Sequence, residues 1–511
     1  MTDSPSPIAL TGQDLDAGTL AEIARGGRGV AIAPEAKARL AASRNVVEAA
    51  IDSGAAVYGI TRGLGPQVTH SLDRGELADF SLRTLRGRAH GIGPALPRDQ
   101  VRAVMAVRLN GLLNGGAGIT PAIAELLAEV LNRKLHPVLP SIGSVGASDL
   151  LILAHLGLAL IGEGEIESGG VVRPAAEALA ETGLIPATLG PKDGIALCSA
   201  SSVSAGLSGL LLHDTAALWR LAQLAAALSL EAYRGNLSPH DPAVTAARPA
   251  PGQAAASAHL LETLAGSALM DQSRARRLQD PISLRAVGPV HGSLLAALQF
   301  LAPAVLAEIN GAGDNPLAVA ERGTLIANAN FHTPALALAL ETLSQAYGQT
   351  GALSVSRAAK HLTPRLSDLP DGLSSRGPGN TGLAPFLKTG EALLQELRHL
   401  AQPAIPDLRW AADGVEDDIT AAPLAAKKAA EALGRLRLLL GVELMVAAQA
   451  LELRAPEHIA PTVADALRSI RTVVPRLDED RSLAGDLERL DRDLLQTGLL
   501  LSQARVPPLP D

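Results

Sequence analysis

The sequence predicts a mostly α-helical protein. Apolar residues recur at helical spacing over residues 36–54, and the pattern stops at Gly54. Alanine and leucine, which have high helix propensity, supply most of the apolar residues in this and the other helical runs. Strand signals are scarce, because short stretches near Val68, Val171 and Thr324 are suited only to small hairpins and no alternation is long enough for a large sheet.

Comparable helical patterns cover much of the remaining chain. They predict helices over 99–113, 121–131, 203–232, 290–310, 333–359, 390–400 and 422–454. The long ones are rich in small side chains, which let helices approach closely, so we expect 203–232, 290–310, 333–359 and 422–454 to form one central bundle. Glycine and proline collect in connectors, where a rigid helical scaffold commonly carries its functional residues.

No composition break divides the chain sharply. We expect an N-terminal, loop-rich region with the active-site loops over 1–200 and a central and C-terminal helical bundle over 201–511. Long helical proteins often share one elongated bundle, so these regions are expected to form one continuous structural unit.

Composition excludes several classes of function. The 511 residues include 44 Lys and Arg against 52 Asp and Glu, a net charge of −8 that argues against a nucleic-acid surface. With only 4 Phe, 3 Tyr and 2 Trp, the chain has few rings for base stacking. The single cysteine, Cys198, excludes an intrachain disulfide and a multi-cysteine zinc site, and it fits a reducing cytoplasm.

Signals for membranes, metals and familiar cofactors are also missing. The N-terminus has no basic, apolar leader, and the longest apolar stretch, 150–161, is shorter than the ~20 residues of a membrane span. No dinucleotide fingerprint, Walker loop or H-E-x-x-H motif occurs, so no metal and no exogenous cofactor is predicted. We expect a cytoplasmic protein that acts on a small molecule.

Three connectors hold candidate functional residues. Tyr58 lies in V-Y-G-I-T-R-G-L-G, where it either packs the glycine-rich turn or serves as a general base made effective by nearby positive charge. In P-S-I-G-S-V-G-A-S-D-L, Ser148 or Asp149 is expected to cap the helix that follows. Arg285 ends D-P-I-S-L-R and is suited either to grip a carboxylate or to form a structural ion pair.

The order of the motifs resembles the histidine and aromatic amino-acid ammonia-lyase family over nearly the whole chain. The matching segments are V-Y-G-I-T-R-G-L-G, R-L-N at 108–110, H-P-V-L-P-S-I-G-S-V-G-A-S, L-I-G-E-G-E at 160–165, P-K-D-G-I-A-L, D-P-I-S-L-R, E-I-N-G-A-G-D-N-P-L at 308–317, N-F-H and V-E-D-D-I-T at 415–420. The resemblance implies a helical bundle of the ammonia-lyase type and a homotetramer whose active sites draw on several subunits. It also implies elimination of ammonia from an α-amino acid, or a 2,3-amino shift.

The resemblance also assigns roles to single residues. Tyr58 matches the family's catalytic base, Arg285 its carboxylate clamp, Phe331 a pocket residue and Glu416 an acidic residue that faces the substrate. Asn310 and Asp314 are of residue types that commonly form turns or cap helices, so a structural role is expected for both.

The family's electrophile, by contrast, is altered. Family members form a methylidene-imidazolone from Ala-Ser-Gly, whereas the matching residues here are Ala147, Ser148 and Asp149, and the downstream match requires that one residue, the glycine, is deleted. A side chain on the ring-closing residue crowds the tight turn that cyclisation needs. Ser199 stands where the family has the asparagine that supports the group, and Ile282 replaces a tyrosine. We therefore predict that residues 147–149 stay uncyclised.

The residues that match the substrate pocket are unusually basic. Arg88 and His90 fall in the family's selectivity loop, and Arg62 follows the Tyr58 motif. If Arg62, Arg88 and Arg285 converge, they favour a substrate with an anionic side chain. Alternatively, Arg62 and Arg88 turn outward to subunit interfaces.

Three functions fit these observations. The first is an ammonia-lyase or aminomutase that still forms its electrophile. The second is an enzyme without the electrophile that uses Tyr58 as base for another elimination, isomerisation or addition. The third is a catalytically silent tetramer that binds a small anion, and the retained Tyr58 and Arg285 argue against it.

Overall fold

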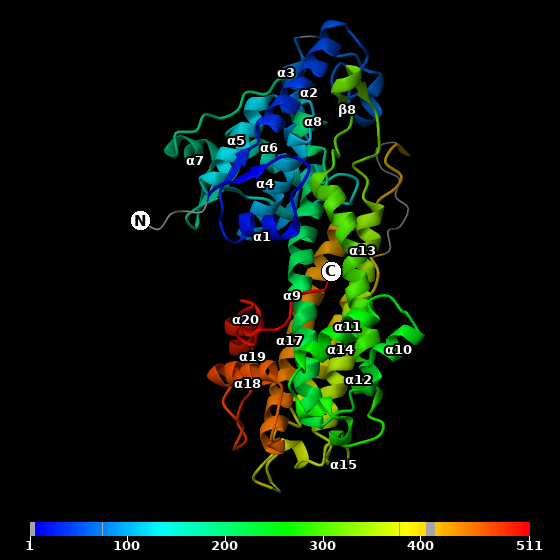
Figure 1. The fold of residues 1–511 in the computed structure, drawn as a ribbon. Coiled ribbons are helices and arrows are strands. Elements are labelled where there is room, and N and C mark those ends of the chain that lie inside the picture. The colour runs from blue at the N-terminus through cyan, green and yellow to red at the C-terminus, as the bar shows by residue number, and fades with distance from the viewer. Residues whose placement is uncertain (1–5, 74, 378, 405–413, 511) are drawn as a thin grey trace. The chain divides into compact units, whose positions relative to one another are not determined.

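The computed structural model describes residues 6–73, 75–377, 379–404 and 414–510. Helices make up 60% of the chain and strands 7%, which confirms the mostly α-helical class (Figure 1). The chain divides into two compact units: unit 1 comprises Met1–His213, Ala302–Leu340 and Ala404–Lys427, and unit 2 comprises Asp214–Leu301, Glu341–Pro403 and Lys428–Asp511. The expected division at residue 200 stays a prediction.

Unit 1 combines short helices with small sheets. Its helices are α1 (Ala17–Ala24), α2 (Pro34–Asp52), α3 (Leu77–Arg86), α4 (Arg98–Leu113), α5 (Pro121–Asn132), α6 (Leu150–Leu160), α7 (Ala175–Glu181) and α8 (Asp193–Cys198). Its strands are β1 (Ile8–Leu10), β2 (Val30–Ile32), β3 (Ile92–Ala95), β4 (His136–Pro137), β5 (Pro140–Ile142), β6 (Glu165–Ser168), β7 (Val171–Pro174), β8 (Leu317–Val319) and β9 (Thr324–Ile326). The strands form four small sheets, with orders β1-β2, β3-β5, β4-β6-β7 and β8-β9.

Two of the three expected hairpins are confirmed. Antiparallel β6 and β7 meet near Val171, and antiparallel β8 and β9 meet near Thr324. The hairpin expected near Val68 is wrong, because Gly65–Thr69 forms a 3₁₀ helix. Pro66 follows the first residue of that helix, where a fixed backbone angle favours helical turns and the missing N–H leaves no unsatisfied donor.

The four longest helices are those expected from periodicity. They are α9 (Ser202–Tyr233), α13 (Val287–Asn310), α14 (Pro334–His361) and α17 (Ala422–Arg454), and their bounds agree with the predicted ranges to within three residues. Unit 2 also contains α10 (Pro242–Ala247), α11 (Gln253–Thr263), α12 (Ile282–Arg285), α15 (Pro364–Ser367), α16 (Leu387–Leu400), α18 (Pro461–Val473), α19 (Ala484–Leu490) and α20 (Leu499–Gln503).

Within unit 2, buried hydrogen bonds join these long helices. The Trp219 indole of α9 donates to the His291 carbonyl of α13 at 2.8 Å. Glu443 of α17 accepts from Ser229 of α9 and pairs with Arg357 of α14, at 2.6 Å in each case, and both members of the ion pair are fully buried. A buried ion pair stabilises little by itself, but breaking it is costly, so this contact favours one arrangement of the helices over others.

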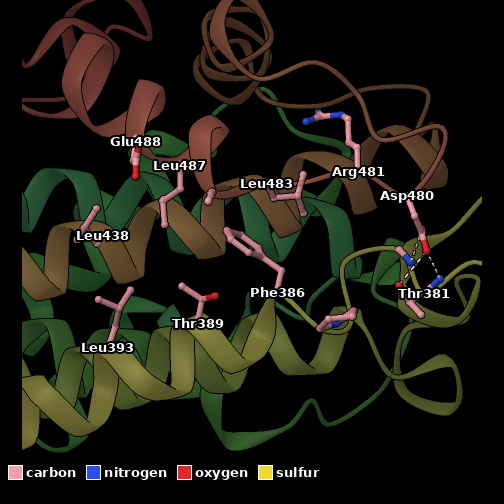
Figure 2. Close-up of a pocket in the computed structure, with 13 residues that line it drawn as sticks. Thr381, Phe386, Thr389, Leu393, Leu438, Asp480, Arg481, Leu483, Leu487 and Glu488 are labelled. Carbon is pink, nitrogen blue, oxygen red and sulfur yellow. Dashed lines mark hydrogen bonds between the residues drawn. The ribbon is translucent and has the colours of Figure 1, made fainter.

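Unit 2 contains a cavity of about 500 Å³ between α16, α17 and α19, together with the segments that precede α16 and α19 (Figure 2). Its wall is largely apolar, with Phe386, Leu438 and Leu487 among the lining side chains. At its polar end the Asp480 carboxylate accepts hydrogen bonds from Thr381 and from the Gly382 N–H. None of the site residues expected from the sequence lines this cavity.

Two apolar helical segments are long enough to cross a membrane by length and composition alone, Asp193–Tyr233 and Val287–Asn310. In the first, 89% of the most apolar window is buried within the protein, as in the core helix of a folded domain. Among the described residues, no group of three or more His, Cys, Asp or Glu side chains is placed to hold a metal ion.

Candidate active site

The loop that contains Ala147 and Ser148 is held by backbone contacts within unit 1. The Ser148 N–H donates to the Phe331 carbonyl at 3.0 Å, and the Asp149 N–H donates to the Ala200 carbonyl at 2.8 Å. Ala147 pairs with His332 in an isolated antiparallel bridge. Ser148 has a φ of 61°, the left-handed region that a residue with a side chain seldom adopts, so the surrounding contacts hold a strained turn.

Asp149 ties this loop to the start of α9. Its carboxylate is fully buried and accepts from the Val203 and Ser204 N–H groups at 2.8 and 2.9 Å. Burial raises the pKa of Asp149, while hydrogen bonds from Ser144, Ser204 and Val203 oppose that rise. Asp149 occupies the N-cap position of α6, but it makes no side-chain cap there, so the expected cap of the following helix is wrong. The carboxylate instead caps a helix that begins more than fifty residues later.

Replacing Asp149 by Ala should lower the free energy of unfolding by about 2 kcal/mol, because two buried N–H groups lose their acceptor. Urea denaturation followed by circular dichroism measures the change. Asp16 caps α1 at an exposed position, through a hydrogen bond from the Thr19 N–H, so Asp16→Ala is the matched control and should cost about 1 kcal/mol or less. Equal losses in the two variants would contradict a buried cap at Asp149.

Tyr58 lies against its own glycine-rich turn. Its phenol oxygen accepts a hydrogen bond from the Gly65 N–H at 3.0 Å, and the side chain is half-buried. The Arg62 guanidinium donates to the Thr69 carbonyl at 3.3 Å and lines a cavity of about 220 Å³ that does not include Tyr58. The Arg62 guanidinium thus makes its hydrogen bond within its own loop.

Arg88 is half-buried, and its guanidinium donates to the Thr84 carbonyl at 3.4 Å. Burial raises the pKa of the Cys198 thiol to about 11, and the charges of Arg88 and Arg108 oppose that rise. Cys198 precedes Ser199, which is buried at the end of α8. His90, two residues beyond Arg88, is exposed, and its charge adds to burial in lowering the pKa of His155.

The remaining expected site residues are less closely grouped. Phe331 is half-buried, and its carbonyl also accepts from the Ser201 hydroxyl at 3.0 Å. Glu416 is exposed. Arg285 belongs to unit 2, where it ends α12, and it forms no ion pair with any described residue. Its Nε is buried without a hydrogen-bond partner.

A buried charged network near the site was not expected from the sequence. Arg108 of α4 donates to Asp314 at 2.7 Å, and both side chains are almost completely buried. Burial lowers the pKa of Lys192 to about 8, while Asp314 opposes the shift. The turn role expected for Asp314 is therefore wrong, because its carboxylate pairs across the unit. Asn310 makes both kinds of contact: its amide donates to the Leu306 carbonyl at the end of its own helix, and its oxygen accepts from the Leu15 N–H and the Asn110 amide.

Comparison with known proteins identifies the relatives of this chain. The sequence pattern described as "Aromatic amino acid lyase" matches residues 15–472. A histidine ammonia-lyase from Anaeromyxobacter dehalogenans (strain 2CP-C) is 38% identical over 504 residues, which cover 96% of this chain and 99% of the relative. The chain belongs to the aromatic amino acid lyase family.

Solved structures of the aromatic amino acid lyase fold agree with this assignment. Ergothionase from Treponema denticola, an ergothioneine-degrading enzyme, has a TM-score of 0.91 and 30% identity, covering 98% of this chain and 99% of that chain. Tyrosine aminomutase from Streptomyces globisporus has a TM-score of 0.92 and 30% identity, covering 99% of this chain and 100% of that chain. This member of the family is a carbon–nitrogen lyase, and its relatives support elimination from an amino acid.

Proposed function

We propose that this lyase eliminates an amine from an α-amino acid or its betaine without a methylidene-imidazolone group, using Tyr58 as base. The base removes the β-proton, the electrons of that C–H bond form the Cα–Cβ double bond, and the Cα–N bond breaks with its electron pair on the departing amine. A 2,3-amino shift would require the same elimination followed by addition of the amine at Cβ.

The proposal rests on the hydrogen bond that the Asp149 backbone N–H already makes. Cyclisation requires that nitrogen to attack the Ala147 carbonyl, but its N–H donates to the Ala200 carbonyl at 2.8 Å. Ring closure would also move the Asp149 carboxylate, which caps α9 from a fully buried position. Loss of such a cap leaves buried donors unsatisfied, so the folded chain opposes the reaction. These contacts support an uncyclised segment.

Without an electrophile, the substrate must supply its own activation. One route is an electron-withdrawing anionic group on the β-carbon, such as a carboxylate, which acidifies the β-proton and stabilises the carbanion. The positive charge of Arg88, which acts on the Cys198 thiol next to Ser199 in the sequence, supports a substrate of this kind. The other route is a leaving group better than ammonia, and a quaternary ammonium provides one because it departs as a neutral tertiary amine. The similarity to ergothionase favours this second candidate, since ergothioneine is itself a trimethylammonium betaine.

An intact-mass measurement under denaturing conditions tests the proposal. We expect the mass calculated from the sequence, and a mass lower by two waters would contradict an uncyclised segment. The same preparation is then assayed with three substrates: histidine, an α-amino acid that carries a β-carboxylate, and the trimethylammonium betaine of histidine. Turnover of either activated substrate, with little turnover of histidine, is expected. Efficient turnover of histidine by the unmodified protein would contradict the activation argument.

The assembly proposed for this lyase is a homotetramer in the cytoplasm with active sites shared between subunits. The resemblance to the family supports it, and so does Arg285, whose guanidinium forms no ion pair with any described residue of its own chain. A carboxylate clamp that acts on a neighbouring subunit's substrate needs such an unpaired guanidinium.

A further inference from the structure

Unit 1 contains a polar cavity of about 380 Å³ that none of the roles above uses. Arg108 of α4, Ser201 and Ser202 at the start of α9, Glu308 near the end of α13, and the loop residues Asn330 and His332 line it. A water molecule takes roughly 30 Å³ in the liquid, so a small organic ion and its hydration fit inside.

Glu308 is the unusual side chain of this cavity. Its carboxylate makes no hydrogen bond or ion pair with any described residue. Burial raises the pKa of Glu308 to about 7, and the charge of Asp149 adds to the rise. Glu308 is half-buried at the cavity wall, and a cation beside its unpaired carboxylate would offset the cost of its partial loss of water.

The charges around the cavity also favour a cation. The Arg108 charge is matched by Asp314 at 2.7 Å, and His332 Nε2 lies 2.9 Å from Asp418. Asp149 adds a buried carboxyl group at the start of α9. Lys192 is the other basic group near Asp314. Burial lowers its pKa to about 8, so above that pH less than half of the Lys192 side chains are protonated. Of the ionisable side chains in the described lining, Arg108 and His332 each have a carboxylate partner, and Glu308 has no charged partner.

The cavity shares its wall with the proposed active site. Ala200, which lines it, accepts the hydrogen bond from the Asp149 N–H. Ser201, also in the lining, donates to the Phe331 carbonyl, and His332 pairs with Ala147. The cavity thus lies directly behind the loop formed by residues 147–149.

We propose that this cavity binds the amine product as a small ammonium ion, with Glu308 as its counter-ion. The inference rests on the proposed function for the origin of the amine, but the binding itself requires no turnover. The amine leaves the substrate with the electron pair of the broken C–N bond, takes up a proton, and pairs with the Glu308 carboxylate. The ligand class is a primary to tertiary ammonium of low molecular weight.

Direct binding of methylammonium and trimethylammonium chloride, measured by calorimetry at constant ionic strength, tests the inference. We expect binding to the native protein that weakens at least tenfold in Glu308→Gln. Glu321→Gln, which neutralises an exposed carboxylate of the same unit, is the matched control and should bind as the native protein does. Equal binding by the native protein and Glu308→Gln would overturn the inference.

The pH dependence of cation affinity in the native protein provides a second measurement, which requires no variant. With a pKa of about 7, Glu308 is mostly protonated at pH 6 and mostly ionised at pH 8. Affinity should therefore rise about tenfold from pH 6 to pH 8, because only the ionised fraction pairs with the cation. Affinity independent of pH, or absence of binding, would overturn the inference even if the enzyme turns over a substrate. Binding with these properties in a protein that turns over nothing would support it and count against the proposed function alone.

Discussion

Replacing Tyr58 by Phe should lower kcat by roughly 10²–10⁴-fold while KM changes little, because the ring stays and only the proton acceptor is removed. The phenol oxygen is half-buried and accepts one hydrogen bond, from the Gly65 N–H at 3.0 Å. Steady-state kinetics with the best substrate of the panel measure the effect.

The control for this prediction is Tyr347→Phe in unit 2. The Tyr347 hydroxyl is fully buried and hydrogen-bonded to Thr215, so this substitution removes a tyrosine hydroxyl that belongs to the other unit. Activity should stay near that of the native protein, with a small loss of stability. Full turnover by Tyr58→Phe would instead leave Tyr58 as a packing residue of its glycine-rich turn.

The sequence predicted the helices well because helical periodicity is a local property. The residues that decide α9 and α17 lie within three or four positions of one another, so their ranges could be read directly from the pattern. The error near Val68 is local as well. A proline close to the start of a short turn outweighs a weak strand signal there.

Contacts between distant segments were the part that the sequence could not predict. Asp149 has the residue type and position of a cap, yet its carboxylate binds the Val203 and Ser204 N–H groups. Asp314 has the residue type of a turn former, yet it pairs with Arg108, which is 206 positions away. A short polar side chain satisfies either a local or a distant partner, and only the packed structure decides between them.

The direction of each arginine side chain decides whether the expected basic pocket forms. Three arginines could be aligned with a substrate site, but sequence spacing does not say where a long, flexible side chain points. The Arg62 guanidinium donates to the Thr69 carbonyl of its own loop, and the Arg88 guanidinium donates to the Thr84 carbonyl four positions before it. Recognition of an anionic substrate side chain by Arg88 and of the α-carboxylate by Arg285 stays part of the proposal.

Removing the Arg285 guanidinium should have the second large effect on catalysis. Arg285→Met should raise KM more than 100-fold, because two charge-assisted hydrogen bonds to the substrate carboxylate, each about 1.5–3 kcal/mol, are lost. Arg285→Lys should raise KM roughly tenfold, since a point charge retains attraction but cannot reproduce a bidentate fork. Neither substitution breaks an ion pair within the described chain, so the stability of the subunit should change little. A structural role would reverse this result, with stability lost and KM unchanged.

Mixing two inactive variants tests whether Arg285 acts across a subunit boundary. Tyr58→Phe and Arg285→Met tetramers, dissociated and reassembled together, should regain part of the native activity if one active site combines Tyr58 of one subunit with Arg285 of another. Each variant reassembled alone is the control and should stay inactive. In mixed tetramers some sites receive both native residues, so activity reappears without any change in either chain. Light scattering must show tetramers in every sample. Mixed tetramers without restored activity would place both residues in the same subunit's site and contradict the shared arrangement.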